Sequence, residues 1–458
     1  MVLPNALISE FGIINYLHSQ YSNRCKNNNS FFDENLDTDI SPTKIIFDNK
    51  LGSWPNSVRH GGSHLFSPFY DDYLDYREAS IHLGKNHVSK YIYFIKVSPH
   101  IDNFIGVNLA AGSKLNGEYF WKHMSAEALE DALQRRAIIL LDYAQENFIE
   151  RATYQNLHEA LRLSGIPKEQ IILIFNSFNA QELYESWFTP IERRLEVRNL
   201  PFVMSASSFH HTNNPTYRMT EDIFQDTKNR IRKNHFLFKI NRCRNHRMAL
   251  LYKMSTDKLL EKGDWSCLTP STFSNQSVQH VASLFQFDIN LNIIEELYKG
   301  LPHSLESECI GEIINQGAWS DLKADAHIDS YFDICSETFI HGEYKSLTEK
   351  VFKPIVNFQP FLFVAWPGSL QVLKDLGFKT FSPFINEEYD NEKDQVKRMN
   401  MIYAEIVRLC AMSKEDIHAW YWNMEEILIH NHRHFLQIYK DEPLSIALID
   451  YLGQRVST

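Results

Sequence analysis

The chain has 458 residues, with 46 Lys and Arg against 57 Asp and Glu, and a formal net charge of −11 at pH 7. This length suggests roughly two to four domains. A content of 44% hydrophobic and 22% charged residues is ordinary for a soluble globular protein. The negative balance argues against a protein whose main task is coating nucleic acid, because such proteins are usually basic.

Six cysteines are scattered singly through the sequence, and none forms a C-x-x-C pair. This spacing indicates a reducing compartment, without a disulfide framework or a zinc ribbon. The N-terminus lacks a basic segment, and no apolar run approaches the ~20 residues that a membrane span needs. We therefore expect a cytoplasmic protein with no membrane span.

Apolar strand patterns and helix patterns alternate through the first half of the chain, after an Asn-, Asp- and Ser-rich stretch that indicates loop. Continuous apolar runs between helices are typical of a parallel sheet that is covered on both faces. The pattern predicts strands over residues 91–97, 137–144, 171–178 and 201–209, and helices over residues 125–136, 153–165 and 179–187.

After a connecting helix expected over residues 220–234, the alternation restarts. Two long helical patterns follow from residue 393, and the second begins at Ser413, a residue type that caps helices. Two α/β units followed by helices are typical of a bilobal enzyme with Rossmann-like lobes and a ligand cleft between them. The restarted pattern predicts strands at 236–241, 265–269, 330–339, 361–366 and 378–381, and helices at 246–254, 346–356 and 367–377.

A basic run at residues 228–247 contains eight Lys and Arg and no acid. Its last part, which includes Arg242, Arg244 and Arg247, follows a predicted strand and opens a helix. Backbone N–H groups, the helix dipole and arginine side chains make such a start an anion site. A solvated loop and a nucleic-acid groove are the alternatives.

The segment Ser346-Leu347-Thr348-Glu349-Lys350 opens a later helix of the same unit. A capping box, with Ser346 as the cap and Glu349 at the third helical position, would explain the serine and the glutamate. It does not explain Lys350 in the first turn, where the helix dipole disfavours a cation. An anionic ligand would remove this conflict.

Both helix starts are expected at the carboxyl edge of one parallel sheet, where open α/β sheets bind their ligands. Arg247 and Lys350 are therefore expected to converge on one diphosphate. Glu349 or Glu337 would accept hydrogen bonds from a ribose.

The pattern SETF…SLTEKVFKPIVNFQPFLFVAWPG is similar to the donor-binding motif of the α1,3-fucosyltransferase-like glycosyltransferases. The segment NRCRNHRMALLYKM resembles the Arg-bearing helix of that family. LKDLGFKTF and EEYD, in combination with these, also resemble glycosyltransferase-like proteins of large tailed phages. The resemblance covers roughly residues 230–395.

The resemblance implies a GT-B fold, a nucleotide-diphosphate sugar as donor, and neither an essential metal nor a cofactor. Lys350 and Arg247 would neutralise the leaving diphosphate, with Thr348 and Arg242 beside them. Glu349 and Glu337 would bind the ribose or the sugar. Ser336-Glu337-Thr338 stands where the family has Phe-Glu-Asn, so the donor sugar stays open. Residues 1–228 would form the acceptor lobe and residues 229–392 the donor lobe, with residues 393–458 packing across both as helices.

An inverting transfer needs a base that takes the proton of the acceptor hydroxyl. Glu146 is the first choice and Asp142 the second, because both follow the buried strand pattern at 137–144. A helix cap or a loop salt bridge is the alternative for each. Asn176 and Asn179 follow the next strand. The histidines of HNHRH, at residues 430–434, lack the spacing of a zinc site and indicate a solvated helix face.

The sequence thus predicts a metal-independent, inverting glycosyltransferase that acts on a hydroxyl acceptor. The acceptor is open between a glycan, a protein and a modified DNA base. A DNA-modifying glycosyltransferase acting on a hydroxymethylated base is one alternative. A non-catalytic nucleotide-binding protein of the same fold is the other.

Overall fold

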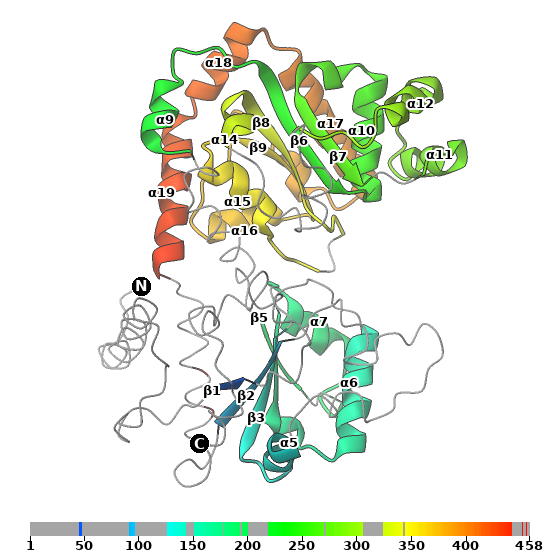
Figure 1. Ribbon diagram of the computed structural model, residues 1–458, viewed down its shortest axis with the longest axis vertical. Helices are drawn as coiled ribbons and strands as arrows, with labels where there is room; N and C mark the ends of the chain where they lie inside the picture. Colours follow the sequence, from blue (N-terminus) through cyan, green and yellow to red (C-terminus); the bar gives the residue numbers. More distant parts are fainter. Residues whose placement is uncertain are drawn as a thin grey trace. The chain divides into compact units, whose positions relative to one another are not determined.

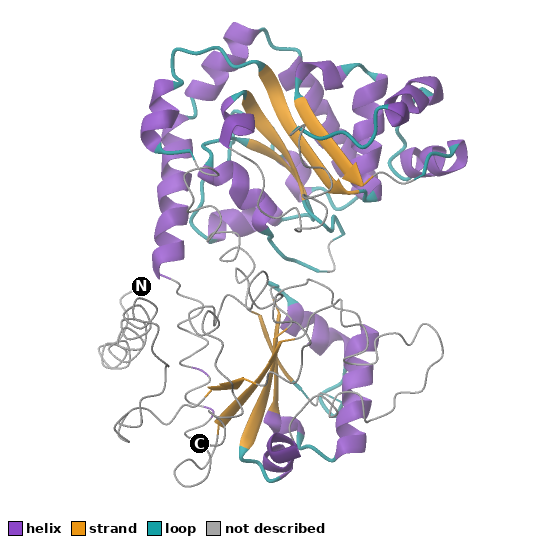
Figure 2. Ribbon diagram, in the orientation of Figure 1, coloured by secondary structure: helices purple, strands orange, loops and turns teal. Residues whose placement is uncertain are grey.

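The computed structural model divides the chain into two compact units, Met1–Ser207 with Glu442–Thr458, and Ser208–Asp441. Each unit contains a parallel sheet flanked by helices (Figure 1, Figure 2). The predicted α/β class with parallel sheets is therefore confirmed. The structure describes residues 45–47, 91–96, 126–142, 151–175, 177–192, 195–199, 219–269, 272–305, 324–341 and 344–441, together with Tyr451 and Arg455.

The sheet of the first unit has five strands in sequential order, β1-β2-β3-β4-β5, and all neighbours are parallel. Right-handed crossovers that always step in one direction place the helices on one face, as Figure 1 shows for α5, α6 and α7. The strands are β1 (Ile45–Phe47), β2 (Tyr91–Lys96), β3 (Ala137–Asp142), β4 (Ile171–Phe175) and β5 (Glu196–Asn199), and the helices are α5 (Ala126–Leu133), α6 (Arg151–Ser164), the short η4 (Lys168–Gln170) and α7 (Ala180–Trp187).

Alternate residues of β3 and β4 form the core under these helices. Leu141 and Leu173 are fully buried in one cluster with Tyr154 of α6 and Tyr184 of α7. The intervening Leu140 is buried as well, so β3 is covered on both faces. This double burial explains why β3 and β4 are continuous apolar runs in the sequence.

The sheet of the second unit has the strand order β7-β6-β8-β9, again all parallel. The chain leaves β6 on one side to form β7 and returns to the other side of β6 as β8. The strand order therefore reverses between β6 and β8, and such a reversal opens a crevice at the carboxyl ends of the two strands. The strands are β6 (Asn234–Arg242), β7 (Asp264–Thr269), β8 (Ser330–Ser336) and β9 (Phe361–Val364).

Helices follow each strand of this sheet and continue to the end of the second unit. α15 contacts β8 and α19, and α17 contacts β6 and β9. The helices are α9 (Glu221–Asp226), α10 (Asn245–Thr256), α11 (Asn275–Ser283), α12 (Leu291–Lys299), α14 (Ala324–Ile328), α15 (Glu349–Val356), α16 (Ser369–Asp375), α17 (Gln395–Cys410), α18 (Lys414–Trp422) and α19 (Glu425–Asp441), with short η5 (Leu259–Lys262) and η6 (Glu388–Asn391).

Two expected helices differ from those observed. The helix expected over residues 220–234 ends at Asp226, and β6 begins at Asn234. The second C-terminal helical pattern is two helices, α18 and α19, although Ser413 caps the first of them as predicted, accepting a hydrogen bond from the N–H of Asp416 at 3.0 Å. The strand predicted at residues 201–209 lies outside the described residues.

The short strand predicted at residues 378–381 is absent from the described structure, and this prediction was wrong. The N–H of Lys379 donates to Oδ1 of Asn431 in α19 at 2.8 Å, and the N–H of Phe381 donates to Oε1 of Glu387 at 2.6 Å. Side chains thus take the backbone hydrogen bonds that a neighbouring strand would otherwise accept.

The contacts group residues 393–441 with the second sheet and Glu442–Thr458 with the first. The expected lobe boundary after residue 228, and the packing of the C-terminal helices across both lobes, stay predictions.

Candidate functional site

The candidate site lies at the carboxyl edge of the second sheet, where the strand order reverses between β6 and β8. The chain runs from β6 into α10 and from β8 through a loop into α15, so both helices begin at this edge. Parallel α/β sheets bind their ligands at this place in the topology.

The first turn of α10 carries positive charge and has no acidic residue. Its N-cap is Arg244, whose side chain makes no capping hydrogen bond. Arg242, the last residue of β6, and Arg244 are both exposed. The N–H groups at a helix start attract anions, and here two exposed arginines reinforce that field.

Arg247 lies in the same turn but points inward, and it is only 4% exposed. Its Nη2 donates to the carbonyl oxygens of Ser336 and Glu337 at 2.9 Å each, and its Nη1 donates to the carbonyl of Arg242 at 3.2 Å. The guanidinium therefore joins the end of β6 to the end of β8. In this arrangement Arg247 acts as a positioning residue at the edge.

His246, beside Arg247, was missed by the sequence reasoning. Its Nε2–H donates to the carbonyl of Glu337 at 2.9 Å. Burial lowers the pKa of His246 to about 3, and the positive charges of Arg247, Arg244 and His341 add to this effect. The imidazole is therefore neutral at pH 7, and its surroundings are cationic.

The carboxylate of Glu337 holds the start of α15. Oε1 accepts the N–H of Thr348 at 2.9 Å, and Oε2 accepts its hydroxyl at 2.7 Å. Thr348 is the N-cap of α15, and Glu349 is the first helical residue. The alternative of a capping box on Ser346 is therefore not observed, because Thr348, held by the carboxylate of Glu337, is the N-cap instead.

Lys350 lies at this cap and is half-buried. Its N–H and its Nζ both donate to Oγ1 of Thr348, at 3.4 and 3.1 Å. The structure thus joins Arg247, Glu337, Thr348 and Lys350 in one hydrogen-bonded network. Their roles toward a diphosphate or a ribose stay predictions, and the side chain of Glu349 lies outside the description.

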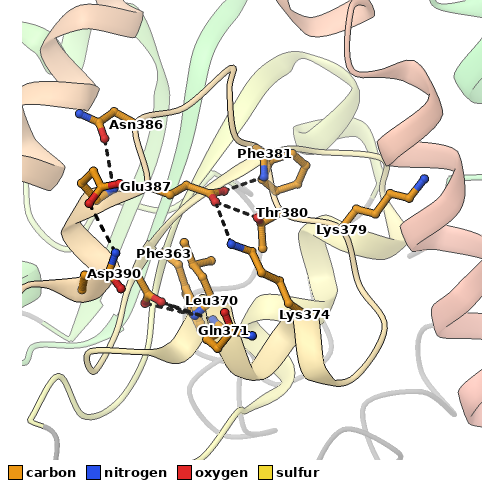
Figure 3. Close-up of polar contacts among 12 residues, drawn as sticks. Phe363, Leu370, Gln371, Lys374, Lys379, Thr380, Phe381, Asn386, Glu387 and Asp390 are labelled. Carbon is orange, nitrogen blue, oxygen red and sulfur yellow. Dashed lines mark hydrogen bonds and ion pairs between the residues drawn. The ribbon is translucent and has the colours of Figure 1, made fainter.

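A third helix of this edge, α16, already has an anion of its own at its start (Figure 3). The carboxylate of Asp390 accepts the N–H of Leu370 with both oxygens at 3.1 Å, and the hydroxyl of Ser369 at 3.0 Å. Glu387 accepts the hydroxyl of Thr380 at 2.7 Å, and burial raises the pKa of its carboxyl. The acidic EEYD segment therefore supports loops and a helix start.

The basic run does not form one continuous surface. Besides Arg247, four more of its eight side chains bind groups of the protein itself, and Arg232 is 1% exposed. These internal contacts reduce the positive charge that the basic run could offer to a nucleic acid. The partners are Glu425 for Lys228, Asp329 for Arg230, the carbonyls of His327 and Ser330 for Arg232, and Asp333 for Lys239.

The two candidate bases belong to the first unit. Asp142 is the last residue of β3, at the carboxyl end of a buried strand, but its side chain is not described. Glu146 and Asn176 lie outside the described residues. Asn179 is the N-cap of α7, and its backbone N–H donates to Oγ of Ser177 at 3.1 Å.

In the part of the chain that the structure describes, no three His, Cys, Asp or Glu side chains come together as a metal site. Ring nitrogens of the HNHRH segment donate to backbone carbonyls: His430 to Gly377, His432 to Val356 and His434 to Leu376.

Within the described ranges, no helix combines the length and apolar character that crossing a bilayer requires.

No protein-family model matches the sequence, and no curated protein is significantly similar to it. Two solved structures that align with the chain are UDP-forming α,α-trehalose-phosphate synthases. For the one from Burkholderia vietnamiensis, identity is 10% and the TM-score 0.35, over 88% of this chain and 83% of that one. For the one from Burkholderia xenovorans, identity is 11% and the TM-score 0.35, over 90% of this chain and 87% of that one. At these values the likeness carries no argument about the chemistry of this chain.

Proposed function

We propose that the chain is a glycosyltransferase that moves a sugar from a nucleotide-diphosphate donor to a hydroxyl acceptor. The observation that carries the proposal is the network of Arg247, Glu337, Thr348 and Lys350 at the reversal point of the second sheet. It lies beside the start of α10, where the N-cap Arg244 makes no capping hydrogen bond with its side chain and where Arg242 and Arg244 are exposed.

The three helix starts of this edge differ in what they can bind. Asp390 fills the start of α16, and Glu337 with Thr348 holds the start of α15. The start of α10 has no acid in its first turn and carries Arg244 as its N-cap. A diphosphate is therefore expected against α10, with Lys350 reaching it from α15.

Transfer of a glycosyl group leaves negative charge on the departing diphosphate. Preorganised cations and N–H groups lower the barrier because they stabilise this charge without reorganising. Arg242, Arg244 and Lys350 would supply that stabilisation, which a divalent metal supplies in other enzymes. Arg247 would act by holding β6 and β8 at the correct separation. The proposed enzyme therefore needs no metal and no cofactor.

The acceptor hydroxyl must lose a proton when it attacks the sugar. We assign this step to the first unit, with Glu146 or Asp142 as the base and inversion at the sugar carbon. Asp142 closes β3 at the carboxyl edge of its own sheet, which is a place where catalytic side chains gather in α/β folds.

Nucleotide binding tests the donor assignment. Thermal shifts with GDP, UDP, ADP and CMP rank the bases, because stabilisation follows affinity by mass action. For the best ligand, Lys350→Ala is expected to lower the affinity about 10- to 100-fold, as loss of one charged hydrogen bond predicts. Lys374→Ala is the matched control, since Lys374 lies in the last turn of α16. Equal affinities in wild type and Lys350→Ala would refute the assignment.

A further inference from the structure

Two cysteine thiols meet beside the start of α10. Cys243 directly follows β6, and Cys267 lies in the neighbouring strand β7. Their Sγ atoms are 3.7 Å apart, and both are reduced. A disulfide needs this distance to fall to about 2.05 Å, so a small shift of the two side chains would bring the sulfur atoms to bonding distance.

The two sulfur atoms differ in their access to solvent. Cys243 is half-buried, whereas Cys267 is fully buried. The hydrogen bond with Cys243, followed by burial, raises the pKa of Cys267, so Cys267 stays a thiol. A small oxidant therefore reaches Cys243 first, and the thiol of Cys267 lies next to it in the interior.

The other described cysteines lack this arrangement. Cys335 and Cys410 are both buried. Burial raises the pKa of Cys335 well above its ordinary value and that of Cys410 to about 12. Their burial keeps a small oxidant away from both sulfur atoms, whereas the half-buried Cys243 is more accessible.

We propose that Cys243 is a redox-modification site for peroxides and that Cys267 resolves the oxidised form. Hydrogen peroxide transfers one oxygen to Sγ of Cys243, which becomes a sulfenic acid while the peroxide leaves as water. The thiol of Cys267 then attacks this sulfur, and its proton leaves with the hydroxyl as a second water. The product is a disulfide, and a reducing thiol reverses the reaction.

The disulfide would act on the anion site proposed above, and this consequence rests on the proposed function. Cys243 immediately precedes Arg244, the N-cap of α10. Drawing Cys243 toward β7 pulls the helix start away from β8, on the opposite side of β6. The contacts of His246 and Arg247 with the end of β8 would weaken, and with them the cradle for a diphosphate.

Peptide mapping of the intact chain after peroxide treatment tests the chemistry. We expect a linked pair of peptides containing Cys243 and Cys267, which dithiothreitol separates. In Cys267→Ala the reaction stops at the sulfenic acid, which dimedone traps at Cys243. Absence of the linked pair in wild type, or labelling of Cys335 and Cys410 in its place, would overturn the proposal.

Nucleotide affinity tests the consequence separately. Oxidised wild type should bind the preferred nucleoside diphosphate at least about fivefold more weakly than the reduced protein, which is the lower end of typical coupling between sites. Peroxide should leave the affinity of Cys243→Ser unchanged. Equal affinities of the two wild-type forms would refute the regulatory effect. A reduced protein that binds no nucleotide would refute the proposed function, whereas the peptide map would still decide the redox site.

Discussion

Arg247 shows how one side chain can hold together the edge at which the proposed site lies. Its guanidinium donates to three backbone carbonyls at the ends of β6 and β8. Replacing it with methionine keeps the apolar stem but leaves buried carbonyls without donors. We expect Arg247→Met to lower the free energy of unfolding by about 2–3 kcal/mol, measured by urea denaturation. The exposed Arg244 is the control: Arg244→Met should change it by no more than about 0.5 kcal/mol. Equal losses in the two variants would contradict the positioning role.

His246 makes a prediction about pH. Its pKa is about 3 in the folded protein, against 6.5 for an unperturbed imidazole. The unfolded chain therefore binds a proton first as the pH falls, so the stability due to neutral His246 is complete above pH 6.5 and is lost below it. Between pH 6.5 and pH 5 the wild type should lose about 2 kcal/mol more than His246→Gln. Urea unfolding of both proteins across this range measures the difference, and parallel curves would contradict a buried, neutral His246.

At the scale of elements, the starts of the helices decide where an anion can bind. Thr348 connects the carboxylate of Glu337 to Lys350 through one hydroxyl. Thr348→Ala should lower the free energy of unfolding by about 1 kcal/mol, as loss of an N-cap does. It should also lower the affinity for the nucleotide. Thr348→Ser retains the hydroxyl and should restore both. Rescue of stability without rescue of affinity would separate the cap from the site and contradict the network.

The start of α16 gives the opposite prediction. Asp390 caps this helix from within the chain (Figure 3), so no ligand is expected there. Asp390→Ala should lower the free energy of unfolding by about 1–2 kcal/mol, with nucleotide affinity unchanged under conditions where the variant is folded. A large loss of affinity, measured by calorimetry, would place the anion at α16.

These helix starts also show what the sequence can and cannot predict. Strands β3 and β4 are predicted well because both of their faces are buried, and continuous apolar runs identify them. The choice of Thr348 over Ser346 as cap depends on Glu337, eleven residues earlier, which only the fold brings near. The missing strand at 378–381 depends on Asn431, in a helix far along the chain. Local sequence patterns cannot predict hydrogen-bond partners that are distant in the sequence.

At the scale of the whole molecule, the alternation of strands and helices predicted two α/β units, and the structure has two parallel sheets. The order β7-β6-β8-β9 was not predicted, although it creates the reversal at which the site lies. The sequence correctly predicted β6 and β8, after which Arg247 in α10 and Glu337 follow in the chain, although β8 ends at Ser336 and not at residue 339. It did not predict that Arg247 turns inward, because burial of a guanidinium is decided by carbonyls on another strand.

Turnover of a nucleotide sugar tests the central claim most directly. Release of nucleoside diphosphate from the donor that corresponds to the tightest nucleotide should be measured with wild type, Lys350→Ala and Lys374→Ala, each in excess EDTA. We predict that wild type and Lys374→Ala release the diphosphate in EDTA and that Lys350→Ala is slower by about tenfold or more, as loss of one charged contact in the transition state predicts. Nucleotide binding with no turnover of any donor, or turnover that EDTA abolishes, would contradict a metal-independent glycosyltransferase.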